Sequence, residues 1–220
     1  MSKVFIGVGH GGSDPGAVAN NVKEKDLNLS IAKACSDELI KYGVEVKMSR
    51  TKDENDTLSE EIKECNAFSP DLAVDIHCNA GCGDGAEVFH HYGGGTGKTL
   101  ATNILDEIIK IGQNSRGVKT RKNSAGQDYY GFIREVTAPA VIVECAFVDN
   151  ATDLEILATE GKRKSMGQAI AKGILKTLGV EIQGDRLYKV QVGAYSVKSN
   201  AEAMLEKLKS AGFTGYIKQE

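Results

Sequence analysis

Three residues of types that can do chemistry stand where short apolar runs of the sequence end. They are His10, His77 and Glu144, and the runs beside them cover residues 4–8, 72–76 and 140–143. In open α/β sheets the carboxyl ends of the strands form the ligand crevice, so we expect these three side chains to converge. A titratable group at the end of a buried strand must pair, bind a ligand or suffer a large desolvation penalty. The chain has only four histidines, and two of them occupy such positions.

Two histidines and one carboxylate, with a further position open to water, form a known ligand set for catalytic zinc. A second carboxylate can then carry protons between the water and a leaving group. This chemistry therefore needs two acidic residues with different roles. Composition and spacing leave several candidates for them, namely Asp14, Glu24, Asp26, Asp75, Glu87 and Glu144.

The elements that must position these residues alternate between strands and helices up to about residue 180. Apolar runs predict strands over residues 4–8, 44–48, 72–77, 86–92 and 140–144. Helical periodicity predicts helices from Leu27 to a stop at Gly43 and over residues 57–68, 99–111 and 165–178. Thr57 and Glu60 fit a capping box at the start of the second helix. This alternation predicts an α/β fold, a twisted and mostly parallel sheet with helices on both faces.

Composition excludes several classes of protein. The net charge of −3 and the lack of a basic stretch interleaved with aromatics argue against a nucleic-acid partner. No apolar run approaches the roughly 18 residues of a membrane span, so we expect no membrane anchor. Five cysteines at irregular spacing favour reduced thiols over a disulfide framework. The amino terminus has no hydrophobic signal region, which predicts cytoplasmic synthesis and action on an external target only after release.

Two further sequence features are better explained without a ligand-binding role. The stretch Gly93–Thr99 is similar to a phosphate-binding loop, but Tyr92 stands where that motif requires glycine, so a flexible turn before a helix is favoured. His90 and His91 are adjacent in a predicted strand and point to opposite faces, so at most one could reach a shared metal.

Seven segments of the chain, in order, resemble a known enzyme family. They are residues 9–17 (GHGGSDPGA), 24–29 (EKDLNL), 49–51 (SRT), 75–80 (DIHCNA), 85–88 (GAEV), 116–118 (RGV) and 139–144 (PAVIVE). Together they resemble the zinc-dependent N-acetylmuramoyl-L-alanine amidases of bacterial cell-wall lysis, third amidase type. The departures are small: Cys78 replaces a small or β-branched residue, and Cys145-Ala146-Phe147 replaces a commoner Thr/Ser-Gly-Phe.

The resemblance implies both a reaction and a division of roles. It implies Zn²⁺ held by His10, Glu24 and His77, with Glu144 as the catalytic carboxylate. It also suggests Arg134 and Asn79 as substrate contacts. The implied reaction is hydrolysis of the amide between N-acetylmuramic acid and L-alanine in peptidoglycan. The partners would then be glycan strands and their stem peptides.

Two alternatives to this activity stay open from the sequence. One is a non-catalytic wall-binding protein that uses a degenerate amidase fold, although the intact set of ligands and acid argues against it. The other is a zinc peptidase that cuts within the stem peptide. Two biological settings also fit, a phage endolysin or an autolysin that lyses the mother cell during sporulation.

The carboxyl-terminal part reads as a separate small unit. We expect a catalytic domain over residues 1–180, a linker over 181–186 and a small βαβ unit over 187–220. Residues 187–220 resemble one copy of the sporulation-related (SPOR) peptidoglycan-binding repeat, about half of a full domain. Such a half has an unpaired strand edge and an uncovered apolar face, so two chains could complete the fold as a homodimer. Docking of the tail on its own catalytic domain is the alternative.

Overall fold

The structure, a computed structural model, describes residues 1–182 and 191–219. Its contacts divide the chain into two compact units, Met1–Ile182 and Gln183–Glu220. The expected linker and the first residues of the expected tail unit fall largely outside the described residues.

A six-stranded sheet forms the centre of the first unit, with the strand order β4-β1-β5-β8-β6-β7. Its strands are β1 (Lys3–Val8), β4 (Glu45–Met48), β5 (Leu72–Asn79), β6 (Ala86–His90), β7 (Ser115–Lys119) and β8 (Ala140–Phe147). The pairs β1–β4, β1–β5 and β5–β8 are parallel, whereas β6 runs antiparallel to β8. A separate hairpin of β2 (Val18–Ala19) and β3 (Val22–Lys23) follows β1.

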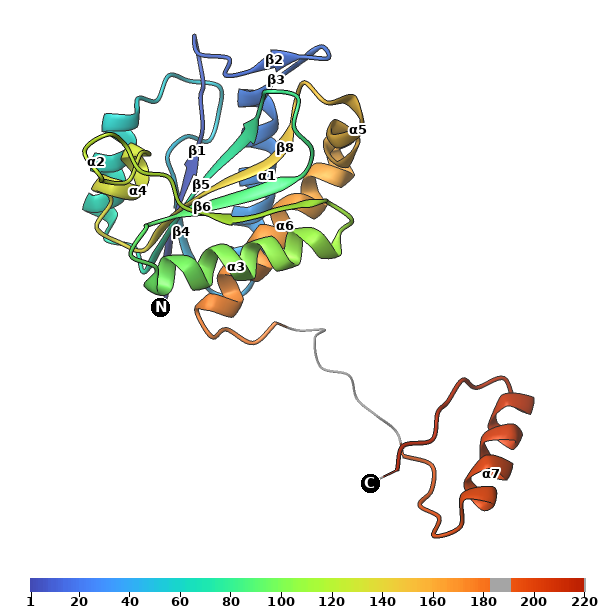
Figure 1. Ribbon diagram of the computed structural model, residues 1–220. Coiled ribbons are helices and arrows are strands. Elements are labelled where there is room, and N and C mark those ends of the chain that lie inside the picture. Colours follow the sequence, from blue (N-terminus) through green and yellow to red (C-terminus); the bar gives the residue numbers. More distant parts are fainter. Residues whose placement is uncertain (183–190, 220) are drawn as a thin grey trace. The chain divides into compact units, whose positions relative to one another are not determined.

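Helices cover both faces of this sheet (Figure 1). On one face lie α1 (Glu24–Lys41), α3 (Gly95–Lys110) and α6 (Glu160–Thr177), and on the other lie α2 (Leu58–Phe68) and α4 (Gly131–Glu135). The short α5 (Ala151–Leu154) and a 3-10 turn (Glu155–Leu157) follow β8. The predicted α/β fold with a mostly parallel sheet and helices on both faces is confirmed.

The strand period of two separates the core residues of β5 and β8 from the polar ones. In β5, Val74, Ile76 and Cys78 belong to the core under α1, α3 and α6, whereas Ala73 belongs to the smaller core under α2 and α4. Since alternate residues share a face, Asp75 and His77 point to the α2 side with Ala73. Glu144 of β8 shares that side with Ala140 and Ile142. The polar residues of both strands therefore gather on one face of the sheet.

The observed elements differ from the predicted ones where local signals were weak. The predicted capping box at Thr57 and Glu60 is present. Helix α6 begins at Glu160, five residues before the predicted start, because Thr159 caps it. Strand β7 was not predicted, since it is a half-exposed edge strand with a polar sequence and a glycine at its centre.

The second unit contains helix α7 (Lys198–Ser210), as the sequence predicted, but its predicted strands are not seen in the described residues. Neither 191–194 nor the segment around Tyr216 and Ile217 forms a strand, and 187–190 lie outside the described residues. Helix α7 begins after Val197, whose side chain makes no capping hydrogen bond. A βαβ half has too few strands to hold a sheet alone, which explains the missing pairing.

Among the residues that the structure describes, no helix is long and apolar enough to cross a membrane.

Candidate metal centre and active site

His10 lies in the turn that follows β1. Its backbone has a φ of 62°, in the left-handed region that residues with a side chain rarely adopt. The ring Nδ1 lies 2.8 Å from Asp14 Oδ2, and the ring Nε2 lies 3.2 Å from Glu24 Oε2. The turn thus directs one ring nitrogen to the start of α1 and the other to a carboxylate of its own loop.

Glu24 is the first residue of α1, where the exposed backbone N–H groups of a helix favour negative charge. Its Oε2 accepts a hydrogen bond from the Ala17 backbone N–H, and its Oε1 accepts one from the Cys78 N–H and one from Asn28 Nδ2. Burial alone would raise the pKa of Glu24, but the hydrogen bonds from His10 and His77 hold it well below its usual range. This side chain is therefore a fixed, buried carboxylate.

His77 lies near the end of β5, with its ring packed against Gly9. A Cβ atom on Gly9 would come within 2.2 Å of the His77 ring, so only glycine fits there. The ring Nδ1 lies 3.1 Å from Glu24 Oε1, and Nε2 lies 3.1 Å from Asp75 Oδ2. Burial opposes protonation of His77, but the charge of Asp75 and the hydrogen bonds to Asp75 and Glu24 together raise the pKa of the imidazole well above its usual value.

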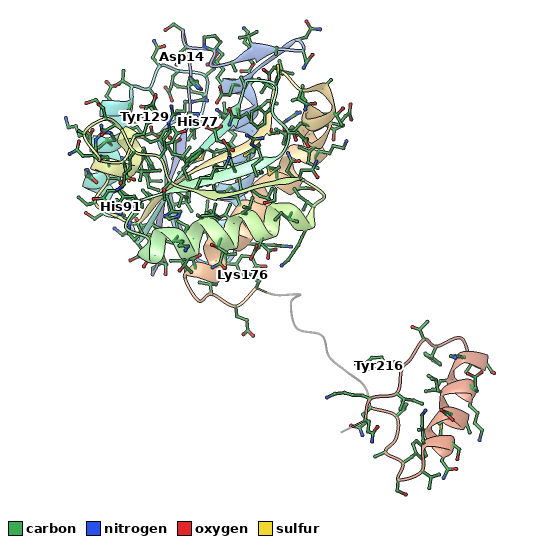
Figure 2. All side chains as sticks on the ribbon, viewed as in Figure 1. Asp14, His77, His91, Tyr129, Lys176 and Tyr216 are labelled. Carbon is green, nitrogen blue, oxygen red and sulfur yellow. The ribbon has the colours of Figure 1, made fainter. Side chains whose placement is uncertain are left out.

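The three predicted ligands meet where β1 and β5 end and α1 begins. His10, Glu24 and His77 each offer a ligand atom, and these atoms all lie within 4.8 Å of one another. Among the described residues no other group of three such side chains meets this condition. Asp14 and His77 both lie at the end of the unit opposite Lys176 (Figure 2). Two imidazoles and one carboxylate at this spacing are a donor set that suits zinc and leaves a position open.

Glu144 lies on β8 directly beside His77, with which it is in parallel register. Burial raises the pKa of Glu144 to about 7, with His77 opposing the shift and the Glu24 charge adding to it. Its Oε2 is buried and has no hydrogen-bond partner in the protein. A buried carboxyl with a pKa near neutrality and a free oxygen can both accept and release a proton during a reaction.

The charge balance of this centre favours a bound cation. Three carboxyl groups surround His77, the buried Glu24 and Asp75 and the half-buried Glu144, and within the described residues none of them forms an ion pair with lysine or arginine. Without a cation, protons on the histidines must balance these charges. The orphaned Glu144 oxygen and the three converging ligand atoms therefore fit a divalent metal with a water beside it.

Arg50 supports both the His10 turn and the start of α1, although sequence reasoning gave it no role beyond the family motif. It is only 2% exposed, which is rare for arginine and marks a structural role. Its guanidinium donates to the backbone carbonyls of Val8, Gly9 and Lys25. Arg50 therefore ties the loop that carries His10 to the helix that carries Glu24.

The two predicted substrate contacts already have partners within the protein. Asn79 Nδ2 donates to Glu87 Oε1, and its Oδ1 accepts from the Ala80 N–H. The Arg134 guanidinium donates to the carbonyls of Asp128 and Tyr129 and to Glu135. Contact of either residue with substrate stays a prediction.

The other acidic and thiol candidates lie apart from the metal ligands or are otherwise engaged. Asp26 is exposed on α1, and Glu87 pairs with Arg116 and Lys119. His90 is buried with its Nδ1 on the carbonyl of His91. All five cysteines are free, and only Cys82 is exposed.

Comparisons with known proteins agree with this arrangement. The family described as N-acetylmuramoyl-L-alanine amidase matches residues 4–176, and the SPOR domain matches residues 165–219. The amidase CwlM of Bacillus licheniformis is 34% identical over 221 residues, which cover 99% of this chain and 85% of CwlM. The sporulation-specific N-acetylmuramoyl-L-alanine amidase of Bacillus subtilis (strain 168) is 33% identical over 223 residues, 99% of this chain and 84% of the relative.

The solved structures give the same result. Cwp6 from Clostridium difficile superimposes on this chain with a TM-score of 0.79 and 39% sequence identity. The match covers 80% of this chain and 29% of Cwp6. The match to the family covers more than half of the chain and includes every segment on which the predicted resemblance rested. The chain therefore belongs to the N-acetylmuramoyl-L-alanine amidase family, enzymes that hydrolyse an amide bond of peptidoglycan.

Proposed function

We propose that this chain cleaves the bond between N-acetylmuramic acid and L-alanine with a zinc ion held by His10, Glu24 and His77. The convergence of these three ligand atoms within 4.8 Å of one another carries the proposal. When bound, zinc would polarise the scissile carbonyl and acidify a water molecule. Amidases of this family are generally zinc-dependent, and the donor set suits that ion.

Glu144 is the proton carrier of this proposal. Its buried carboxyl takes a proton from the attacking water and returns it to the amine of L-alanine as the bond breaks. A pKa near 7 lets one group perform both transfers at neutral pH. Glu24 cannot do so, because its hydrogen bonds keep it ionised.

The decisive experiment combines metal analysis with identification of the reaction product. Purified protein should contain about one zinc per chain, and a chelator should abolish digestion of peptidoglycan until zinc is restored. Mass spectrometry of the digest should show stem peptides with a new L-alanine amino terminus. A new terminus elsewhere in the peptide would indicate the peptidase alternative, and zinc binding without digestion would indicate the wall-binding alternative.

Gly9→Ala is expected to disrupt the metal centre without removing a ligand. The added methyl group would come within 2.2 Å of the His77 ring and force it away from Glu24. We expect zinc affinity to fall at least about tenfold, the lower end of the range seen when the orientation of a ligand is lost. Competition with a chromophoric chelator measures this.

Gly161→Ala provides the matched control for this change. Gly161 lies in the first turn of α6, where a Cβ atom would meet nothing closer than 3.9 Å. Its replacement should leave zinc affinity unchanged and raise helix stability slightly. An equal loss of zinc in both variants would contradict the steric argument.

The carboxyl-terminal unit is proposed to bind glycan strands and keep the enzyme on its insoluble polymer. The SPOR match at residues 165–219 supports this role. In α7 the side chains of Met204, Leu205 and Leu208 are only half-buried, and Phe213 and Tyr216 are 64% and 70% exposed. These side chains form an apolar surface that the described residues of the unit leave exposed, and we propose a second copy of the tail as its cover in a homodimer.

Truncation to residues 1–182 separates these roles. On intact cell walls the shortened protein should be at least about tenfold slower, because tethering raises the local enzyme concentration. On a soluble muropeptide the two proteins should have equal rates, and this serves as the control. Equal rates on intact walls would contradict the tethering role.

The same pair of proteins tests the homodimer. In light scattering we expect twice the chain mass for residues 1–220 and a single chain mass for residues 1–182. Monomers in both samples would contradict dimerisation through the tail. The proposal that the tail binds the cell wall would be unaffected.

A further inference from the structure

Two buried carboxyl groups behind the metal ligands have no role in the chemistry described so far. Asp75 is 3% exposed on β5, and Glu61 is 7% exposed on α2. Asp75 Oδ1 and Glu61 Oε1 are both buried without a hydrogen-bond partner. Burial of unpaired carboxyl oxygens is costly, so their presence needs an explanation.

Gly7 provides the space in which these two oxygens lie. A Cβ atom at Gly7 would come within 2.1 Å of Glu61 Oε1 and 2.7 Å of Asp75 Oδ1. Both oxygens therefore sit over the same α-carbon of β1, facing one small space. Two carboxylates this close cannot both remain ionised when buried.

Of the two, Glu61 is the neutral one. Burial raises the pKa of Glu61 well above its usual value, and the charge of Asp75 raises it further. Asp75 has a compensating partner that Glu61 lacks, because its Oδ2 lies 3.1 Å from His77 Nε2. The geometry thus pairs Asp75 with His77 and leaves Glu61 Oε1 behind it without a partner among the described residues.

The contact with Asp75 decides which nitrogen of His77 is available to a metal. A carboxylate only accepts hydrogen bonds, so the Nε2 that faces it carries a proton. Nδ1 faces Glu24 Oε1 at 3.1 Å in the same way, but Glu24 belongs to the proposed ligand set and Asp75 does not, so a metal held there would replace the proton on Nδ1 and leave the one on Nε2. A metal ligand must be free of its proton, and an acceptor on the opposite nitrogen fixes the tautomer that allows this.

We propose that Asp75, with the neutral Glu61 behind it, is a positioning residue that holds His77 with Nδ1 free for the metal. This inference rests on the proposed zinc site and adds to it a buried chain from α2 through β5 to the ligand. Asp14 makes the corresponding contact with Nδ1 of His10, but its side chain is 65% exposed. The buried contact at Asp75 therefore has the larger effect.

The test compares zinc affinity in single variants of the full chain by competition with a chromophoric chelator. Asp75→Asn should weaken zinc binding about 10- to 100-fold, because the neutral amide no longer favours the proton on Nε2. Glu61→Gln should bind zinc within about threefold of the parent, since an amide mimics a neutral acid. Glu107→Gln is the control: Glu107 is buried on α3 and paired with Lys176, so its replacement lowers stability without affecting zinc.

Each outcome bears on the proposal. If Asp75→Asn binds zinc within threefold of the parent, the positioning role of Asp75 is overturned and the zinc site itself is unaffected. If Glu61→Gln loses as much zinc affinity as Asp75→Asn, the assignment of Glu61 as the neutral acid is overturned. Absence of zinc binding by the parent would overturn the zinc site and this inference together. Should Asp75→Asn fail to fold, ¹⁵N NMR of the zinc-loaded parent decides: the proposal requires ligation of His77 through Nδ1 and a proton on Nε2, and the reverse pattern overturns it.

Discussion

Replacing Glu144 by glutamine is expected to leave zinc bound and to lower amidase kcat by about 10²- to 10⁴-fold. Glutamine keeps the shape of the side chain but can neither take a proton from water nor return one to the leaving amine. The three ligands come from the His10 turn, the start of α1 and the end of β5, so their positions do not depend on this carboxyl group. Zinc content and kcat on a soluble muropeptide, measured on the same sample, check both parts.

A matched control for this variant is Glu64→Gln. Glu64 is an exposed residue of α2 that pairs with Lys47, and its replacement should change neither zinc content nor kcat. If Glu144→Gln digests peptidoglycan at the parent rate, the proton carrier is a different residue. If it loses zinc instead, Glu144 supports the metal as well as the reaction.

The same variant has a distinct stability profile in its zinc-free form. Glu144 has a folded-state pKa of about 7 against a usual 4.5, so the unfolded chain releases this proton at lower pH than the folded one. The carboxyl group therefore destabilises the zinc-free parent progressively as pH rises through that window. In thermal unfolding, the stability of the zinc-free glutamine variant relative to the zinc-free parent should rise between pH 4.5 and pH 7. Above pH 7 the difference in stability should be constant.

The strand-end positions of His10, His77 and Glu144 could be predicted because buried strands have a strong sequence signal. Each follows or ends a run of β-branched residues, and the topology of α/β folds brings such ends together. The sequence could not choose among the six acidic candidates, because only the position of α1 in the fold brings Glu24 to the two histidines. Its hydrogen bonds from Ala17 and Cys78 come from segments far apart in the sequence.

The residues that hold the metal ligands in place were harder to predict than the ligands themselves. Arg50 had no role beyond the family motif and Asp75 was only one of six acidic candidates, because the burial of both depends on packing between elements and not on local spacing. The period of two in β5 does place Asp75 on the same face as His77, which is the one signal that could have found it. In the tail, the alternation of apolar residues predicted strands, but a strand forms only where a partner edge exists.

Replacing Glu24 by glutamine is expected to abolish metal binding and activity together. A neutral amide is a poor zinc ligand, and the loss removes the only carboxylate among the three ligands. We expect the zinc dissociation constant to rise more than about 100-fold, beyond the effect of changing a residue behind a ligand. Excess zinc should stabilise the parent by about 2.7 kcal/mol at 100 times its dissociation constant and should not shift the melting temperature of this variant at the same concentration.

Glu38→Gln is the matched control, because Glu38 is a buried residue of the same helix that pairs with Lys41 on the surface side. Its melting temperature should still rise with zinc, even if its own stability is lower than that of the parent. A Glu24→Gln protein that binds zinc like the parent would show that Glu24 is not a metal ligand. The carboxylate at the start of α1 would then serve the fold, through its hydrogen bonds to Ala17 and Cys78, and the third ligand would have to be sought among Asp14, Asp75 and Glu144.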